Sequence, residues 1–261
     1  KSGNVYAVWT GNDHGIYFSH RPKGQNWSNS IRLDDNKEGY NNFPQIAVDD
    51  KENLYVVFSA NGTYFFYKPA GNKWSGGVKI SSAQAFDIKV DHNRNAYAAF
   101  YEGTKLKYSY RPAGGQWSKT FLIDDKINSS RVFQRPGFAV DPSGNLHAIW
   151  GGYYSHGSTG KTWTPKIKLG EKAGSPSSVT VDSSGNVYAV WCEFFKSNNL
   201  FESKNVIYFS CRPKGGKWSS KVKISDIPVG ESTIDIAVSP SGEVYVIWIS
   251  QSSDIYVISG K

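Results

Sequence analysis

One short apolar sequence motif occurs six times along this chain, and it limits the folds that the chain can adopt. Each copy ends in Trp or Phe, and the copies read NVYAVW at 4–9, NLYVVF at 53–58, NAYAAF at 95–100, NLHAIW at 145–150, NVYAVW at 186–191 and EVYVIW at 243–248. Successive terminal aromatics are 49, 42, 50, 41 and 57 residues apart. Periods of this length are typical of β-propeller blades rather than of leucine-rich or helical repeats.

Each repeat contains four strand-like runs, which we label A to D, and the repeated apolar motif is run B. Run A ends in Val-Asp in four copies, as in SVTVD at 178–182, and a Gly- or Asn-containing turn joins it to B. Run C ends in Arg-Pro or Lys-Pro in most copies, as in VIYFSCRP at 206–213, and run D begins at a Trp, as in WSSKVKI at 218–224. Four short runs rich in Tyr, Val, Ile and Trp, repeated along the chain, predict four-stranded antiparallel blades.

The number of runs predicts the number of blades. Run A occurs five times, B six, C six and D five, which makes 22 strands and falls between five and six complete blades. We expect an all-β fold with six blades, the first lacking A and the last lacking D, in a single β-propeller domain over residues 1–261. Five blades is the alternative. The edges of the incomplete blades could recruit another protein chain.

Composition narrows the class of protein further. Aromatic residues make up 15% of the chain, which excludes a disordered segment. No apolar run approaches the roughly 20 residues that a membrane span needs. The chain has no Met and few charges, which fit a secreted β protein, so we expect a secreted or cell-surface protein. Cys192 and Cys211 should be free thiols, because antiparallel pairing of their strands keeps them apart.

The net charge of +8 indicates anionic partners, such as an acidic polysaccharide. The basic residues are 23 Lys against 7 Arg, and many of the Lys alternate with apolar residues along the D runs. Nucleic-acid binding favours clustered Arg beside stacking aromatics, so it is not expected here.

The turns between runs C and D carry a second repeated pattern. In STGKTW at 158–163, Gly160 lies three residues before Trp163, and four other turns keep the same Gly and Trp, ending at Trp27, Trp74, Trp117 and Trp218. This pattern resembles the Asp-box, or bacterial neuraminidase repeat, of sialidase-like β-propellers. The Asp of that motif is replaced by Pro or Ser in every turn, so the motif is degenerate. The resemblance implies a non-catalytic or lectin-like propeller, in which these Trp side chains pack between strands.

An enzymatic function is the less favoured hypothesis. Sialidase activity would need an arginine cluster to hold a carboxylate, and only Arg131 and Arg135 reach the rim of B–C loops and D–A connectors, where the variable segments lie. Glu102 and Glu193 follow B runs and could serve a polysaccharide-degrading hydrolase or lyase, but we interpret them as solvated loop carboxylates. No metal-ligand spacing and no cofactor motif is present, so neither metal nor cofactor is expected.

Aromatic and amide side chains on the same rim favour carbohydrate binding. Sugars present apolar faces and hydroxyl edges, which aromatic walls with a few polar anchors match. The predicted ligand-binding residues are Tyr153, Tyr154, Glu193, Arg135, Arg131, Tyr101, Glu102 and Phe194. Tyr153 and Tyr154 should lie shallow and open, with Glu193 and Arg135 as anchors. A structural or protein-docking propeller in a larger surface assembly is the alternative.

Overall fold

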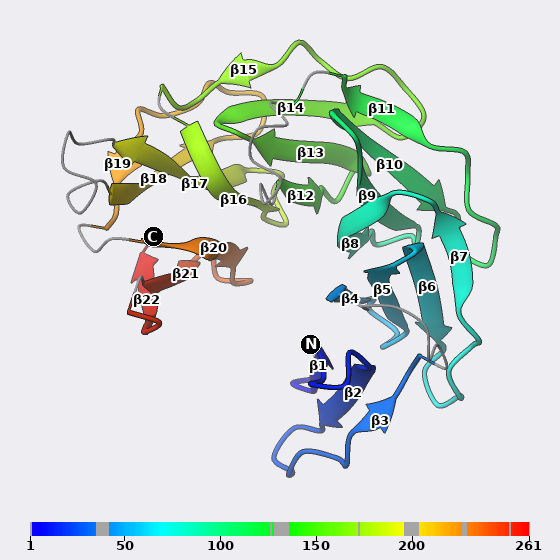
Figure 1. The fold of residues 1–261 in the computed structure, drawn as a ribbon. Helices are drawn as coiled ribbons and strands as arrows, with labels where there is room; N and C mark the ends of the chain where they lie inside the picture. The colour runs from blue at the N-terminus through cyan, green and yellow to red at the C-terminus, as the bar shows by residue number, and fades with distance from the viewer. Residues whose placement is uncertain are drawn as a thin grey trace. The chain divides into compact units, whose positions relative to one another are not determined.

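A computed structural model describes residues 2–34, 42–125, 127, 136–171, 173–195, 204–225, 229–250 and 252–260. These residues form strands and turns and contain no helix (Figure 1). Accordingly, no helix in the described part of the chain could cross a membrane. The strands form six antiparallel sheets, four with four strands and two with three. The fold is a six-bladed β-propeller, which confirms the predicted class and makes the five-blade alternative wrong.

The chain divides into two compact units, residues 1–125 and 126–261, with three blades in each. The strands of the first unit are β1 (Val5–Thr10), β2 (Ile16–Arg21) and β3 (Ile31–Arg32) in blade one; β4 (Asn42–Val48), β5 (Leu54–Ala60), β6 (Gly62–Lys68) and β7 (Val78–Ser81) in blade two; β8 (Gln84–Val90), β9 (Ala96–Glu102), β10 (Lys105–Arg111) and β11 (Phe121–Asp124) in blade three.

The second unit repeats this order. Its strands are β12 (Gly137–Val140), β13 (Asn145–Trp150), β14 (Tyr153–Ser158) and β15 (Ile167–Lys168) in blade four; β16 (Ala173–Val181), β17 (Val187–Phe195), β18 (Lys204–Arg212) and β19 (Val222–Lys223) in blade five; β20 (Val229–Val238), β21 (Val244–Ser250) and β22 (Ile255–Gly260) in blade six.

The missing strands are those that the run count predicts. Blade one is ordered β1-β2-β3 and has no A strand, and blade six is ordered β20-β21-β22 and has no D strand. The D strands are shorter than the sequence indicates, since β3, β15 and β19 have two residues each and the preceding Trp lies outside the strand. Recruitment of another chain at the edges stays a prediction.

The A–B turns explain the repeated Val-Asp of run A. Asp182 accepts hydrogen bonds from the backbone N–H groups of Ser184 and Asn186, from Nδ2 of Asn186 and from the hydroxyl of Tyr188, at 2.8–3.0 Å. Oδ1 of Asn186 accepts from the backbone N–H of Lys214 in the C–D turn. In blades two, three and five the pattern Asp-x3-Asn-x-Tyr therefore fastens the A–B turn and links it to the neighbouring C–D turn.

The B–C hairpin of blade five keeps the two cysteines apart. Cys192 pairs with Ile207, and Cys211 pairs with Tyr188 near the other end of the hairpin. Both cysteines are free, as predicted. Burial raises the pKa of the Cys192 thiol to about 12, so this cysteine is an inert core residue.

Candidate functional site

Neighbouring blades within a unit meet through a repeated aromatic contact. Between blades two and three, the ring of Phe65 on β6 meets Trp117 edge-on, with centroids 5.0 Å apart. The Arg111 guanidinium at the end of β10 covers this pair, with Cζ 5.7 Å from the Phe65 centroid and 5.3 Å from that of Tyr67. A planar guanidinium stacks well on aromatic rings, so Arg111 fills this seam.

The seam between blades four and five is filled in the same manner. Tyr154 on β14 meets Trp218 edge-on at 4.8 Å, and Cζ of Arg212 lies 5.2 Å from the Tyr154 centroid and 5.9 Å from that of Trp218. In blades three and five the Arg-Pro end of the C strand therefore has a structural role, which is to cover an aromatic pair of the preceding blade.

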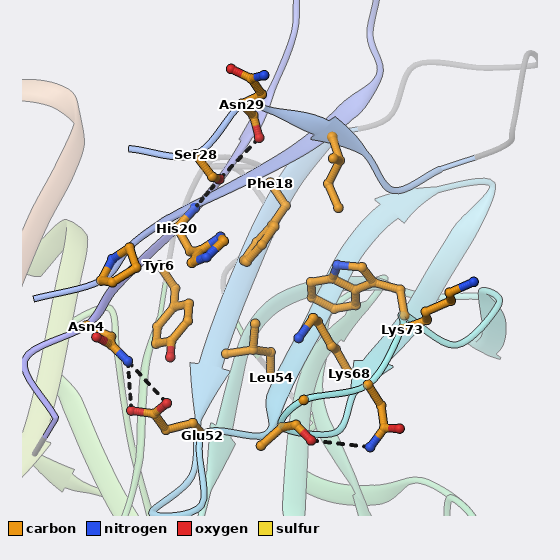
Figure 2. A pocket seen from close by; sticks show the side chains of 16 residues that line it. Asn4, Tyr6, Phe18, His20, Ser28, Asn29, Glu52, Leu54, Lys68 and Lys73 are labelled. Atoms are coloured by element: carbon orange, nitrogen blue, oxygen red, sulfur yellow. Dashed lines mark hydrogen bonds between the residues drawn. The ribbon is translucent and has the colours of Figure 1, made fainter. Parts of the chain in front are cut away.

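The seam between blades one and two keeps the aromatic pair but lacks the arginine. Phe18 on β2 meets Trp74 edge-on at 5.1 Å, and the residue at the arginine position is Lys68. A cavity of about 700 Å³ opens at this seam (Figure 2). The Lys68 side chain is half-buried and makes no ion pair, hydrogen bond or ring contact with the described residues. The seam is hollow because a thin, flexible lysine replaces a stacked guanidinium.

One side of the cavity carries a fixed carboxylate. Nδ2 of Asn4 donates to both oxygens of Glu52, at 3.0 and 3.2 Å. Hydrogen bonds from Ser2, Asn4 and Tyr6 hold the pKa of Glu52 below its ordinary value. In a complete blade the Asp of the A strand binds the equivalent Asn and Tyr. Blade one has no A strand, so Glu52 of blade two takes that place.

The remaining lining combines apolar walls with polar groups. Tyr6, Phe18, Leu54 and Trp74 form the walls. His20, Ser28, Asn29, Lys68 and Asn72 add donors and acceptors. In Figure 2, Tyr6, His20 and Phe18 lie opposite Lys68, and Lys73 points away from the cavity. A volume of this size admits a ligand of one to a few sugar rings, and such a lining suits a molecule with apolar faces and hydroxyl edges.

The structure places Tyr154 in the core rather than at an open surface. Its ring is fully buried, and its hydroxyl lies 2.7 Å from Nδ1 of His147. Desolvation raises its pKa. The expectation that Tyr154 is open to solvent is wrong, because the seam with blade five covers the ring. Tyr153 beside it is half-buried, with Nζ of Lys166 5.2 Å from its centroid.

Glu193 is also buried, which corrects its interpretation as a solvated carboxylate. Its side chain is 2% exposed, and Oε1 lies 2.5 Å from Nζ of Lys221 and accepts a hydrogen bond from Nε1 of Trp191 at 3.2 Å. A carboxylate so enclosed and paired is not an open anchor for a ligand. The next residue, Phe194, is half-buried on β17 opposite Asn205.

Glu102 is the solvated carboxylate that the sequence predicts. It is exposed and forms an ion pair with Lys107, which lowers its pKa. Tyr101 beside it is half-buried and packs against Phe86, with centroids 5.1 Å apart. Neither residue belongs to the cavity of Figure 2.

Arg131 and Arg135 lie outside the described residues, as do most of the variable segments that form the rim of B–C loops and D–A connectors. A binding site on that rim stays a prediction. The described cavity lies on the opposite rim, which the A–B and C–D turns form. No group of three or more His, Cys, Asp or Glu side chains able to hold a metal ion occurs among residues whose placement is described.

The cavity was not predicted from the sequence, although the residue before each C–D turn marks it. Aligned on the C strands, the position before the C–D turn reads Arg21, Lys68, Arg111, Gly157 and Arg212. The departure from Arg at Lys68 marks the seam between blades one and two, which no guanidinium fills. Without the structure, nothing shows that this arginine covers the aromatic pair of the preceding blade.

No protein-family model and no curated protein matches the sequence. Solved structures resemble it in fold. An ulvan lyase bound to -[GlcA(1-4)Rha3S]- is 13% identical with a TM-score of 0.68, covering 99% of this chain and 78% of that one. An Aleuria aurantia lectin mutant in complex with Fucalpha1-6GlcNAc is 11% identical, with a TM-score of 0.62 and coverages of 98% and 87%.

A mutant of NanB sialidase from Streptococcus pneumoniae is 11% identical, with a TM-score of 0.65. The alignment covers 98% of this chain and 65% of the sialidase. At these identities the comparisons show the fold alone, which is a sialidase-like β-propeller fold that also occurs in lectins and polysaccharide lyases. The degenerate Asp-box motif finds no independent support in sequence matches.

Proposed function

We propose that this propeller binds carbohydrate in the cavity between blades one and two. The observation that carries the proposal is the substitution of Lys68 for the arginine that fills the two other described seams of this kind. The aromatic pair is retained at this position, and both rings line the cavity, Phe18 as a buried residue and Trp74 as a half-buried one, so that their apolar surface forms its wall. Asn4, His20, Glu52 and Asn72 surround that surface with polar groups.

The similar folds support this class of ligand without assigning it. A lectin, a sialidase and a polysaccharide lyase share the fold, and the lyase and the lectin are structures with bound saccharides. Secretion or display at a cell surface accords with such a role and is part of the proposal. An enzymatic role has less support, because Glu193 is buried against Lys221 and Glu102 is an exposed ion-paired residue.

The test replaces Lys68 with arginine, the residue that fills the two other described seams. Lys68→Arg should stack on Phe18 and Trp74 as Arg111 and Arg212 stack on their partners, so it should leave the melting temperature equal or higher. We expect saccharides that bind the wild-type protein on a glycan array to lose at least about tenfold in affinity, roughly 1.4 kcal/mol. Isothermal titration would measure the change.

Lys214→Arg is the matched control, because Lys214 is exposed in the C–D turn of blade five. It should change neither affinity nor melting temperature. The proposed site is wrong if Lys68→Arg folds and binds as well as the wild type. Absence of any saccharide binding by the wild-type protein would overturn the proposed function itself.

A further inference from the structure

We infer that the ligand of this cavity is an acidic saccharide, whose carboxylate or sulfate group pairs with the Lys68 ammonium. The inference rests on the proposed function and names its ligand class. The cavity holds one carboxylate whose donors are already in place and one ammonium that has no partner in the described chain. A ligand that completes this arrangement supplies an anion to the ammonium.

Lys68 has the position and burial of a ligand-binding cation. In Figure 2 its side chain reaches toward Leu54, and both residues line the cavity together with Trp74. Most lysines of a soluble protein place the ammonium in water, whereas this one is half-buried at a seam. An ammonium beside the walls of a cavity gains more from an anion than one in open water does, because the walls exclude part of the screening water.

Glu52 does not neutralise Lys68. Its oxygens accept from Asn4, and donors on Ser2 and Tyr6 also act on it, all of them on the blade-one side of the cavity. No ion pair joins Glu52 and Lys68 in the described structure. Glu52 is therefore placed to accept hydrogen bonds from sugar hydroxyls while the anion lies on the Lys68 side.

The apolar walls separate this ligand class from a free inorganic anion. Phe18 and Trp74 offer ring faces and edges next to Lys68, and His20 stacks on Phe18 with centroids 6.0 Å apart. Ring surface contributes to binding a sugar face and contributes little to phosphate or sulfate alone. An acidic sugar interacts with the Lys68 ammonium through its anionic group and with the aromatic walls through its ring face.

The experiment compares paired saccharides that differ in charge alone. Uronic acid oligosaccharides and their carboxyl-reduced forms, and sulfated galactan oligosaccharides and their desulfated forms, are titrated into the protein of residues 1–261. We expect the acidic member of at least one pair to bind about tenfold tighter or more. Inorganic sulfate at the same concentration should not displace it measurably.

Lys68→Gln tests whether the Lys68 charge determines the preference for the acidic saccharide, since it keeps a polar side chain of similar length and removes the charge. We expect its affinity for the acidic member to fall to that for the neutral member. Lys214→Gln removes the same charge from an exposed turn on the same rim and should keep the preference. Circular dichroism and melting temperature confirm that both variants are folded.

The outcomes separate this inference from the proposed function. Equal binding of acidic and neutral members by the wild-type protein overturns the acidic ligand class and leaves carbohydrate binding intact. Equal losses in Lys68→Gln and Lys214→Gln show that bulk charge attracts the acidic saccharide, which also overturns the inference. Failure of every saccharide to bind removes the proposed function, and this inference falls with it.

Discussion

Tyr154 is held by both its ring and its hydroxyl, so we expect substitutions there to change stability. Tyr154→Ala removes a fully buried ring beside Trp218 and Arg212, and large aromatic truncations in a core cost about 3–5 kcal/mol. Tyr154→Phe removes only the hydroxyl that contacts His147, at about 1 kcal/mol. Urea denaturation of both variants measures the loss. Wild-type stability in Tyr154→Ala would contradict the core assignment.

Glu52 occupies a backbone conformation that suits glycine. Its φ is 63°, and the same turn position holds Gly in blades one, four, five and six, at Gly3, Gly144, Gly185 and Gly242. A non-glycine residue at positive φ costs of order 1 kcal/mol, and such outliers often mark functional sites. The side chain of Glu52 faces the cavity, which gives a reason for accepting that cost.

Arg94 provides a matched comparison for Glu52, because it has a φ of 64° at the same position of blade three. We expect both Glu52→Gly and Arg94→Gly to change the free energy of unfolding by no more than about 1 kcal/mol. Only Glu52→Gly should weaken saccharide binding, since only Glu52 lines the cavity. Titration calorimetry on both variants decides this. Equal binding by the two variants would remove Glu52 from the site.

At the scale of the strand and turn, the A–B turns make the fold sensitive to acid. Burial raises the pKa of the Asp182 carboxyl, but hydrogen bonds from Asn186, Tyr188 and Ser184 outweigh it, and the net pKa is lowered. A lowered pKa contributes stability above the ordinary Asp value of about 3.9 and loses it as the pH falls toward the folded-state pKa. Asp182→Asn should therefore destabilise the protein near pH 6 and less so at lower pH.

Melting temperatures of the wild type and of Asp182→Asn between pH 2 and 7 test this expectation. The difference between the two proteins should shrink as the pH falls below about 4. The wild type should still lose stability in acid through other groups, such as Asp141, whose pKa is also lowered. A difference that does not vary with pH would show that the Asp182 charge contributes nothing.

The elements were predictable from the sequence because each blade repeats a local pattern. Alternation of apolar residues gives the strands, Gly and Asn give the turns, and the number of runs gives the two incomplete blades. The cavity was not predictable, because it depends on contacts between blades. The sequence predicts Trp74 as a structural residue, and it is one, but it also lines the cavity beside Lys68, which precedes the C–D turn.

The expected exposure of Tyr154 and Glu193 was wrong for a related reason. Tyr154 and Glu193 follow B strands at places that look like loop ends, yet the adjoining blade or the D strand covers them. Trp218 covers Tyr154, and Lys221 pairs with Glu193. Period-two patterns show which face of a strand is apolar, but they do not show which side chains of a neighbouring blade or strand cover a strand end.

At the scale of the whole molecule, the blades should open in an order that their burial sets. Strands β5 and β9 are almost wholly buried along the B position, whereas β1 and β21 alternate between exposed and half-buried or buried residues. Repeat folds are stabilised by nearest-neighbour contacts, so blades with exposed strands open first. We expect backbone amides of blades one and six to exchange with deuterium faster than those of blades two and three.

Ligand binding should alter that order at one end only. A saccharide in the cavity contacts both Tyr6 and Phe18 of blade one and Leu54 and Trp74 of blade two, so it stabilises the closed form of their seam by mass action. At about 100 times Kd the protection of β1 and β2 should rise by a factor of up to about 100. Strands β21 and β22, which do not line the cavity, serve as the internal control and should exchange at an unchanged rate. Protection of β21 and β22 without protection of β1 and β2 would place the ligand elsewhere and contradict the proposed site.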